Sequence, residues 1–406
     1  MRPVKFSESS LVVAATPYLR AFSFCTVVMP PYFTLRSSPA YHRSWLLHLL
    51  RTFFILYILV QFVISFWIAQ VNNESIRNYV DKHSADSITK VLSTGITIAQ
   101  VTVQAAICIQ TLTGCQLLRN IFISIVHLER DVRQHYTDDW PLSALRRRLC
   151  LRSGLWLLVV CTIVPYLSYQ LTNTAISPIE RVITVYFATL VQVKSVEYCV
   201  NVQLVQELLR LVQRQLLHLR RELVRCEEME SRWTLYADLH TNQQLLARVW
   251  NLLNKVERYF CIPMLMLFFY NGFSITQAIH WAYINFEQDD LNKRLCRIIY
   301  TVMVIVMLFI PCYQSQCCID EYNHFGTMLH KLKTVGIDES LSMRLQEYSL
   351  QLMHQQMLFT CGGFFEINLK NFGAIILTIT TYVVILIQFK LQAETEKKTD
   401  GRVRFE

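Results

Sequence analysis

The stretch that decides the fold is NFGAIILTITTYVVILIQF, residues 371–389. It carries no charged side chain, and as a helix it is long enough to cross the hydrocarbon core of a bilayer, which is about 30 Å thick. A helix that is apolar on nearly all sides is typical of a membrane span. The sequence therefore predicts that the chain enters a membrane near its end.

The composition extends this interpretation to the whole chain. Of the 406 residues, 53% are hydrophobic and only 17% are charged, and the mean hydropathy is +0.29, values above those of ordinary soluble proteins. Several apolar windows approach the length of a membrane span. We therefore predict an all-α membrane protein with seven transmembrane helices and cytosolic helical extensions. The predicted spans are residues 52–71, 91–117, 154–173, 182–202, 259–284, 298–318 and 371–389.

Two charged residues interrupt the fourth predicted span. Lys194 and Glu197 are three positions apart, which places them on one helical face where they could pair. The alternative is that the span ends near Val193 and that the charges lie beyond it. The sequence leaves both interpretations open.

The distribution of basic residues predicts the orientation, because short loops rich in Lys and Arg stay in the cytosol. Residues 1–51 contain six basic residues and one acidic residue, and the connection after the second span contains seven arginines. The connection after the first span is balanced in charge and contains the sequon at Asn73, which predicts an extracellular glycosylation site. Seven spans then give an inverted topology, with the N-terminus inside and the C-terminus outside. The five basic residues of the tail, 390–406, oppose this orientation, but charges after the last span have limited influence.

The N-terminal segment contains an apolar stretch, residues 11–33, that could be mistaken for a signal peptide. Arg20 interrupts it, and no small-residue cleavage site follows it. We expect a retained segment that lies on the cytosolic membrane surface.

Two long segments between spans combine leucines at helical spacing with many charges. Residues 203–258 follow the fourth span and are expected to break at 227–231, and residues 319–370 lead to the last span with a break at 335–338. They form either amphipathic hairpins within one subunit or an anchor through which subunits pack. The predicted organisation is then a cytosolic segment (1–51), spans one to four (52–202), an anchor region (203–258), spans five and six (259–318), a second anchor region (319–370), the last span (371–389) and an extracellular tail (390–406).

Motifs of enzymes and metal sites are missing from the sequence. The 13 cysteines form no Cys-x-x-Cys pair, and Cys317-Cys318 near His324 lacks the spacing of a zinc site. There is no phosphate-binding loop, no His-Glu-x-x-His and no Gly-x-Ser-x-Gly. We expect no enzyme activity, no metal and no cofactor. The net charge of +9 is explained by basic residues along the inner leaflet, so no nucleic-acid partner is expected.

The last span has one small and polar face. Its members follow one another at steps of four, three, four and three residues, which keeps them on one side of a helix. Polar groups on a spanning helix face protein or water, so this face either packs against other helices or lines a pore. The residues are Ala374, Thr378, Thr381, Ile385 and Gln388.

The end of this span also carries a motif. Thr381-Tyr382 and Gln388-Phe389 are separated by five apolar residues, and together with Cys361-Gly362-Gly363-Phe364-Phe365-Glu366-Ile367-Asn368 and Thr16-Pro17-Tyr18-Leu19-Arg20-Ala21-Phe22-Ser23 they resemble the insect gustatory receptor family. The motif-level similarity covers mainly residues 360–389. That family is related to the insect odorant receptors, which act as ligand-gated cation channels.

The resemblance implies a receptor in the plasma membrane of sensory neurons that assembles as a homotetramer or with other gustatory receptor subunits and depolarises the cell by passing cations. It also implies residue roles in the last span: Ile385 as the gate, Gln388 as a residue that influences ion passage, and Tyr382 and Phe389 as supports. No acidic residue lies on the predicted pore face, so we expect poor selectivity among cations. Sugar-sensing members often carry an acidic residue after the motif tyrosine, and this chain has Val383, which favours a bitter or other non-sugar ligand.

A small organic tastant is expected to bind among the outer halves of spans two to six, where aromatic and amide side chains could stack and form hydrogen bonds. The alternative is that these side chains are interfacial aromatics or packing residues. The candidates are Gln100, Gln104, Tyr166, Tyr169, Gln170, Tyr186, Asn271, Gln277, Trp281 and Tyr300.

Two other classes of membrane protein fit the sequence less well. A G-protein-coupled receptor would show Asp/Glu-Arg-Tyr after its third span and Asn-Pro-x-x-Tyr in its seventh, and both are missing. A secondary transporter would show paired broken helices in two repeated halves, whereas Pro165 and Pro263 are single interruptions. The predicted function is therefore a ligand-gated chemosensory channel.

Overall fold

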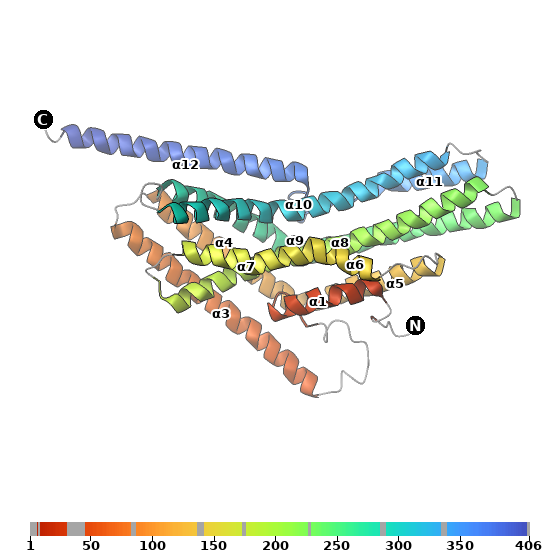
Figure 1. Cartoon of the computed structure of the whole chain (residues 1–406), viewed down its shortest axis with the longest axis horizontal. Helices are drawn as coiled ribbons and strands as arrows, with labels where there is room; N and C mark the ends of the chain where they lie inside the picture. Colours follow the sequence, from red (N-terminus) through yellow and green to blue (C-terminus); the bar gives the residue numbers. More distant parts are fainter. Residues whose placement is uncertain are drawn as a thin grey trace.

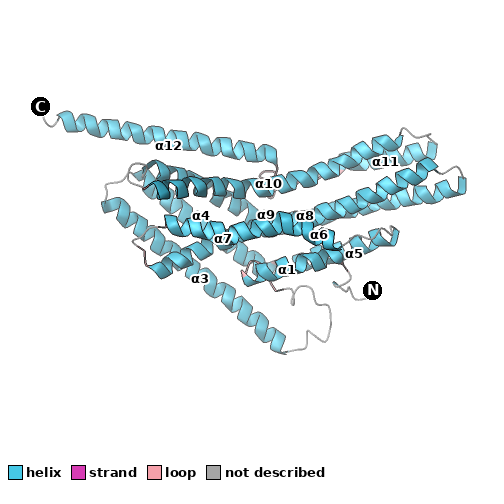
Figure 2. Cartoon of the chain, in the orientation of Figure 1, coloured by secondary structure: helices cyan, strands magenta, loops and turns pink. Residues whose placement is uncertain are grey.

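The computed structural model describes Phe6 and residues 9–30, 45–82, 87–135, 142–172, 176–225, 229–284, 290–333 and 339–403. Almost all of these residues are helical (Figure 2), and the described part contains one isolated β-bridge, between Thr360 and Glu366, and no longer strand. The prediction of an all-α protein is confirmed.

Most of the helices run along the long axis of the molecule (Figure 1). Their long hydrophobic stretches make them stable as helices only when packed together or placed in lipid. In chain order they are α1 (Ser10–Phe24), α3 (Trp45–Lys82), α4 (Ser87–Thr113), α5 (Cys115–His135), α6 (Leu142–Leu149), the π-helical turn η3 (Cys150–Gly154), α7 (Leu155–Leu171), α8 (Pro178–Arg225), α9 (Met229–Ile284), α10 (Leu291–Lys333), α11 (Glu339–His354) and α12 (Leu369–Val403).

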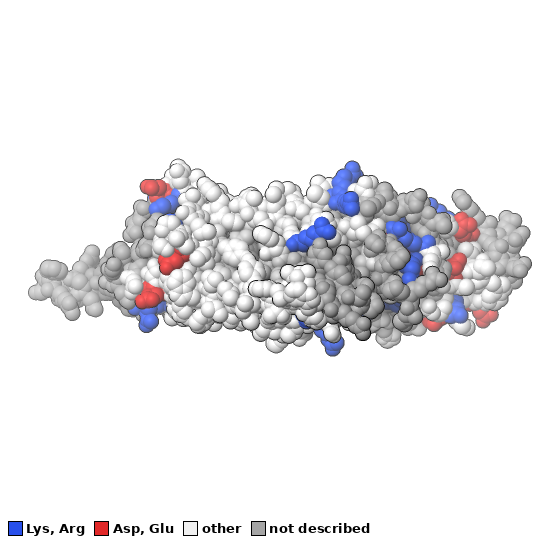
Figure 3. All heavy atoms as spheres, turned by 90° about the horizontal axis from the view of Figure 1, so that it is seen from below, with Lys and Arg blue, Asp and Glu red and all other residues white. Residues whose placement is uncertain are grey.

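A broad band of the surface is free of charged groups. Figure 3 shows this band with mixed acidic and basic side chains at one edge and basic side chains at the other. Six helical segments are long and apolar enough to cross a membrane, namely His48–Ser75, Thr89–Thr113, Ser143–Leu171, Trp233–Ile284, Leu291–Leu332 and Leu369–Gln392. The band and these segments together agree with a multi-pass membrane protein.

The fourth predicted span lies in α8. This helix is not among the six segments, because its polar residues lower its mean hydropathy. Every residue from Leu190 to Leu209 is buried, because α8 packs against α7, α9 and α10. A helix that is surrounded by protein can carry polar side chains if they find partners there. This explains why hydropathy is weakest for a helix that lies at the centre of the bundle.

Lys194 and Glu197 are both fully buried, and the ammonium lies 2.5 Å from the carboxylate. The ammonium also lies over the rings of Tyr259 and Phe260, at 5.1 and 5.3 Å from the ring centres. The predicted pairing is confirmed. Because Tyr259 begins the fifth predicted span, the pair lies at the level where that span starts.

Helices α8 and α9 continue beyond this level and pack with the end of α10 and with α11 (Figure 1), in the segments whose role as an anchor region stays a prediction. Asn242 is fully buried there and donates to the carbonyl oxygen of Val212 over 3.0 Å, and it accepts from the Tyr348 hydroxyl over 2.8 Å. Burial raises the pKa of Tyr348 well above its usual value, so its hydroxyl stays a donor at physiological pH. Of the predicted breaks, residues 227–228 and 335–338 lie outside the described residues, whereas residues 229–231 are helical and begin α9.

The N-terminal helix packs against other helices of the protein. Leu11, Ala15 and Phe22 are buried, and α1 packs against α5, α6 and α8. The carboxylate of Glu129 accepts the backbone N–H groups of Ser10 at 2.9 Å and Leu11 at 3.2 Å. This packing could not be predicted, because the partner that satisfies the start of α1 is 119 positions away in the sequence. The location at the cytosolic membrane surface stays a prediction.

Two connections are helical where we expected irregular chain. α3 extends through the predicted loop to Lys82, so Asn73 lies in a helix and is half-buried. Glycosylation of Asn73 stays a prediction. α12 continues past Phe389 to Val403, so most of the predicted tail is helical.

Candidate functional site

A short hairpin and a helix cap determine where α12 begins. Two glycines with positive φ, Gly362 at 62° and Gly363 at 80°, make the turn, because residues with a side chain rarely adopt this conformation. The N–H of Ile367 donates to the carbonyl oxygen of Phe359 over 2.6 Å and closes the hairpin. Asn368 then caps α12, and its side-chain oxygen accepts the N–H of Asn371 over 2.8 Å.

The hairpin packs against α9 and α10. A methyl group at Gly362 would come within 2.8 Å of the Cys261 sulfur on α9, so the close approach itself requires glycine. Cys361 is buried nearby, and burial, together with Cys261, Cys312 and Glu257, raises the pKa of its thiol. This thiol therefore stays neutral and packs as a small apolar group.

One face of α12 holds the helix to the bundle. Ile379 and Val383 are buried, with exposed fractions of 8 and 9%, and Ile379 approaches Gly272 of α9. Phe372 lies edge-on to Phe309 of α10, with ring centres 5.3 Å apart. These contacts fix which side of α12 is turned away from its own subunit.

The opposite face of α12 is not covered by any of the described residues. Only 11% of its apolar window is buried, against 22–56% for the other five candidate spans. Figure 1 shows α12 along the outside of the bundle. The structure thus places the predicted pore residues together on one exposed face, and these are Ala374, Thr378, Thr381, Ile385 and Gln388.

The threonine hydroxyls of this face donate within the helix. Thr378 bonds to the carbonyl oxygen of Ala374 and Thr381 to that of Leu377, each over 2.9 Å. Each hydroxyl oxygen keeps lone pairs that can accept a further hydrogen bond. The face therefore presents acceptors and has no acidic side chain. The motif residues Tyr382 and Phe389 are also exposed, at 60 and 59%, and flank it.

The ten predicted ligand residues do not form one group. Tyr166, Gln170 and Tyr186 are exposed on the outside of the bundle, and Tyr169 lies under the guanidinium of Arg181 at 4.5 Å. Gln104 and Asn271 are buried, and the remaining candidates are half-buried, namely Gln100, Gln277, Trp281 and Tyr300. The exposed tyrosines fit the alternative interpretation of surface aromatics.

The two buried candidates face α8. Asn271 accepts a hydrogen bond of 2.7 Å from Gln192, and Gln104 donates to the carbonyl oxygen of Phe187 over 3.5 Å. Gln192 and Asn271 lie about 20 Å along their helices from the ends opposite the anchor. Gln192 is not among the predicted ligand residues, and it lies beside the charges that suggested an early end of the fourth span.

Several buried polar atoms here have no hydrogen-bond partner. They include Nε2 of Gln100, Oε1 of Gln104, Oε1 of Gln192 and Oγ of Ser93. Ser93, Gln100 and Gln104 follow one another at intervals of seven and four residues, so they share one face of α4. Buried polar groups in proteins are nearly always satisfied by protein, water or ligand. This face of α4 and the amide of Gln192 can therefore bind a polar group.

Known proteins share this architecture. The chain is 33% identical over 392 residues to a protein of Drosophila melanogaster that bears the name gustatory receptor 98b, covering 95% of this chain and 96% of that one. It is 30% identical over 394 residues to gustatory receptor 98c of the same species, covering 95% of both.

Among solved structures, the insect olfactory receptor OR5 from Machilis hrabei superimposes with a TM-score of 0.63 at 11% identity, over 92% of this chain and all of that chain. The same receptor in complex with eugenol gives a TM-score of 0.65 at 12% identity, over 93% of this chain and 99% of that chain. At these identities the likeness shows the seven-helix receptor fold. Residues 16–393 match the 7tm chemosensory receptor family, and the chain belongs to that family as a gustatory receptor relative.

Proposed function

We propose that this chain is a subunit of a ligand-gated, poorly selective cation channel in the plasma membrane of sensory neurons. The observation that carries the proposal is the exposed polar face of α12. The threonine hydroxyls donate within the helix, but the amide of Gln388 would need partners in lipid, where unsatisfied polar groups cost several kcal/mol. Four copies of α12 around an axis, from one receptor or from a mixture of subunits, would turn this face towards water.

Ile385 is the proposed gate. It is the aliphatic member of an otherwise small or polar face, so four copies give an apolar ring that excludes water when narrow. Gln388 lies three residues further along the same face and forms a polar ring beside it. Without acidic side chains the pore attracts cations only through oxygen acceptors, which gives weak selectivity.

The ligand is proposed to be a small non-sugar organic molecule, and the receptor would respond as a taste receptor does. Support comes from the unsatisfied amides of α4 and α8, which can orient a polar group inside an apolar bundle. The structure of the olfactory receptor with eugenol agrees with this ligand class. Binding need only favour the open arrangement by a few kcal/mol to shift the population strongly.

The test is a pair of substitutions one residue apart on α12. Ile385 and Val384 are similarly exposed, at 38 and 47%, but point about 100° apart around the helix. In cells that lack insect receptors, Ile385→Ala is expected to raise the resting current and Val384→Ala to leave it at the wild-type value. Currents would be recorded before and during panels of bitter compounds, sugars and cuticular lipids, with surface expression measured in parallel.

A resting current that is equal in both variants at equal surface expression would remove Ile385 as the gate. A ligand response that is abolished by G-protein block would replace the channel with a metabotropic receptor.

A further inference from the structure

Along the continuous helix of α6, η3 and α7, the exposed side chains change from arginines to leucines within about two helical turns. We call this segment, residues 146–155, the step. Arg146 and Arg147 are exposed on α6, and Leu151 and Leu155 follow on the same continuous helix with exposed fractions of 64 and 58%. Charged side chains belong among lipid head groups and leucines among acyl chains. This step therefore marks the surface of the bilayer.

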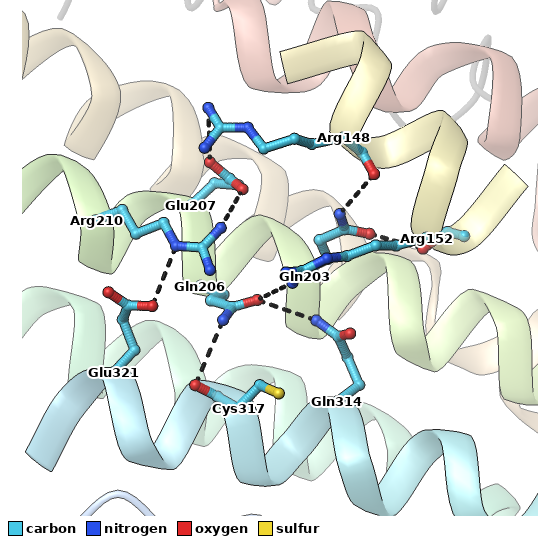
Figure 4. A network of polar contacts seen from close by, with 10 residues as sticks. Arg148, Arg152, Gln203, Gln206, Glu207, Arg210, Gln314, Cys317 and Glu321 are labelled. Atoms are coloured by element: carbon cyan, nitrogen blue, oxygen red, sulfur yellow. Dashed lines mark hydrogen bonds and ion pairs between the residues drawn. The ribbon is translucent and has the colours of Figure 1, made fainter. Parts of the chain in front are cut away.

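The other two arginines of this step are held by α8. Arg148 lies 3.5 Å from the buried carboxylate of Glu207, and Arg152 donates to the side-chain oxygen of Gln206 over 3.2 Å (Figure 4). In the π-helical turn that contains Arg152, Ser153 donates to Gln203 over 2.7 Å. Arg148 and Arg152 are thus held in place on the protein side of the step.

The same network reaches α10. Glu207 also pairs with Arg210 at 2.8 Å, and Arg210 donates to Glu321 over 3.1 Å (Figure 4). Gln206, in turn, accepts from Gln314 over 3.2 Å. Because both carboxylates are engaged within the network, they have little remaining capacity to neutralise the arginines on α6.

The carboxylates of the network do not pair with the exposed arginines of α6. Arg152 bonds to a neutral amide, and none of the described acidic residues forms an ion pair with Arg146 or Arg147.

We propose that Arg146 and Arg147 form a binding site for the phosphorylated head group of an anionic lipid. Guanidinium groups bind phosphate oxygens in pairs, and basic clusters immediately beside a transmembrane helix attract anionic lipids. Leu151 and Leu155 lie where the acyl chains of that lipid would begin, which favours a lipid over a soluble phosphate or an acidic protein. The site requires that α6 lies at the bilayer surface and does not depend on ion conduction by the chain.

The experiment uses the purified full-length protein in detergent and native mass spectrometry. Bound phosphatidylinositol bisphosphate, phosphatidylserine and phosphatidylcholine with the same acyl chains are quantified for the wild type and for R146Q/R147Q. Each arginine near an anionic surface contributes about fivefold in affinity, so the double variant is expected to bind the bisphosphate lipid about thirtyfold more weakly. Phosphatidylcholine binding is expected to be weak in both proteins.

The matched control is R220Q/R221Q, which removes the same charge from α8 about 20 Å beyond Gln206 in the anchor region. This variant is expected to bind the lipid as the wild type does. Equal loss in both double variants, or no loss in R146Q/R147Q, would overturn the site. Soluble inositol trisphosphate that binds as tightly as the lipid would overturn the assignment to a membrane source.

Discussion

The contact between Glu129 and the start of α1 lets us predict how strongly a substitution of Glu129 weakens the packing of α1. Each carboxylate oxygen has its own donors: Oε1 accepts the N–H of Ser10 and pairs with Arg133, and Oε2 accepts the N–H of Leu11 and the hydroxyl of Ser9. Glu129→Gln replaces one of the oxygens with an amide NH2 group, and we expect the oxygen that remains to face Arg133. The variant then loses the two bonds at Oε2.

We expect the docking of α1 to weaken by about 3 kcal/mol, since each hydrogen bond to a buried charged group contributes about 1.5–3 kcal/mol. The new NH2 group would also face other hydrogen-bond donors. The salt bridge adds little to this value because the Arg133 side chain is 47% exposed. A cost of this size raises the population of undocked α1 roughly a hundredfold.

Hydrogen–deuterium exchange of the peptide that covers Ser10–Phe24 measures this population. The exchange rates of its buried amides are expected to rise by roughly that factor, while those of α8 stay unchanged. Glu347→Gln is the control, because Glu347 pairs with Arg344 on the surface of α11 at 51% exposure. If α1 exchanged at wild-type rates in folded Glu129→Gln protein, the carboxylate would not be what holds the helix.

Two further substitutions test the hairpin and the buried ion pair. Gly363→Ala places a side chain at a φ of 80° and is expected to lower the free energy of unfolding by about 1–2 kcal/mol in thermal unfolding. Gly326→Ala, in a helix with free space around it, is expected to raise it by about 0.5–1 kcal/mol. Changes of equal sign in the two variants would contradict the conformational argument. Lys194→Met leaves Glu197 buried without its cation and is expected to cost about 3–5 kcal/mol, seen as a loss of monodisperse protein after purification. Adding Glu197→Leu is expected to restore most of the yield, and a double variant no better than the single one would show that the pair itself does not matter.

Hydropathy predicted the fold well wherever a helix meets lipid. It was weakest at α8, because protein surrounds the buried stretch and its polar residues are satisfied by neighbours such as Asn271. It also did not predict the burial of α1, which depends on Glu129. Contacts between distant positions decide both cases, and a single sequence does not display them.

The exposed face of α12 could be predicted because helical periodicity alone groups its residues. The proposed ligand residues could not be grouped in this way, since they come from several helices and their depth depends on packing. Tyr186 illustrates the difficulty: its aromatic ring and hydroxyl suit a ligand site, yet its hydroxyl accepts from Gln61 and its ring is partly outside the bundle. Gln192 could be identified as a candidate only from its contact with Asn271 in the structure.

The hairpin at Gly362 and Gly363 has a mechanical consequence. It packs beside Cys261, two residues before Pro263 of α9, and near Cys312, which follows Pro311 of α10. Proline removes one backbone hydrogen bond, so each of these helices is most compliant at the level where the hairpin touches it, while α8 between them has no proline after its first residue and stays stiff. Bending of α9 or α10 at these prolines would therefore move the hairpin that leads into α12.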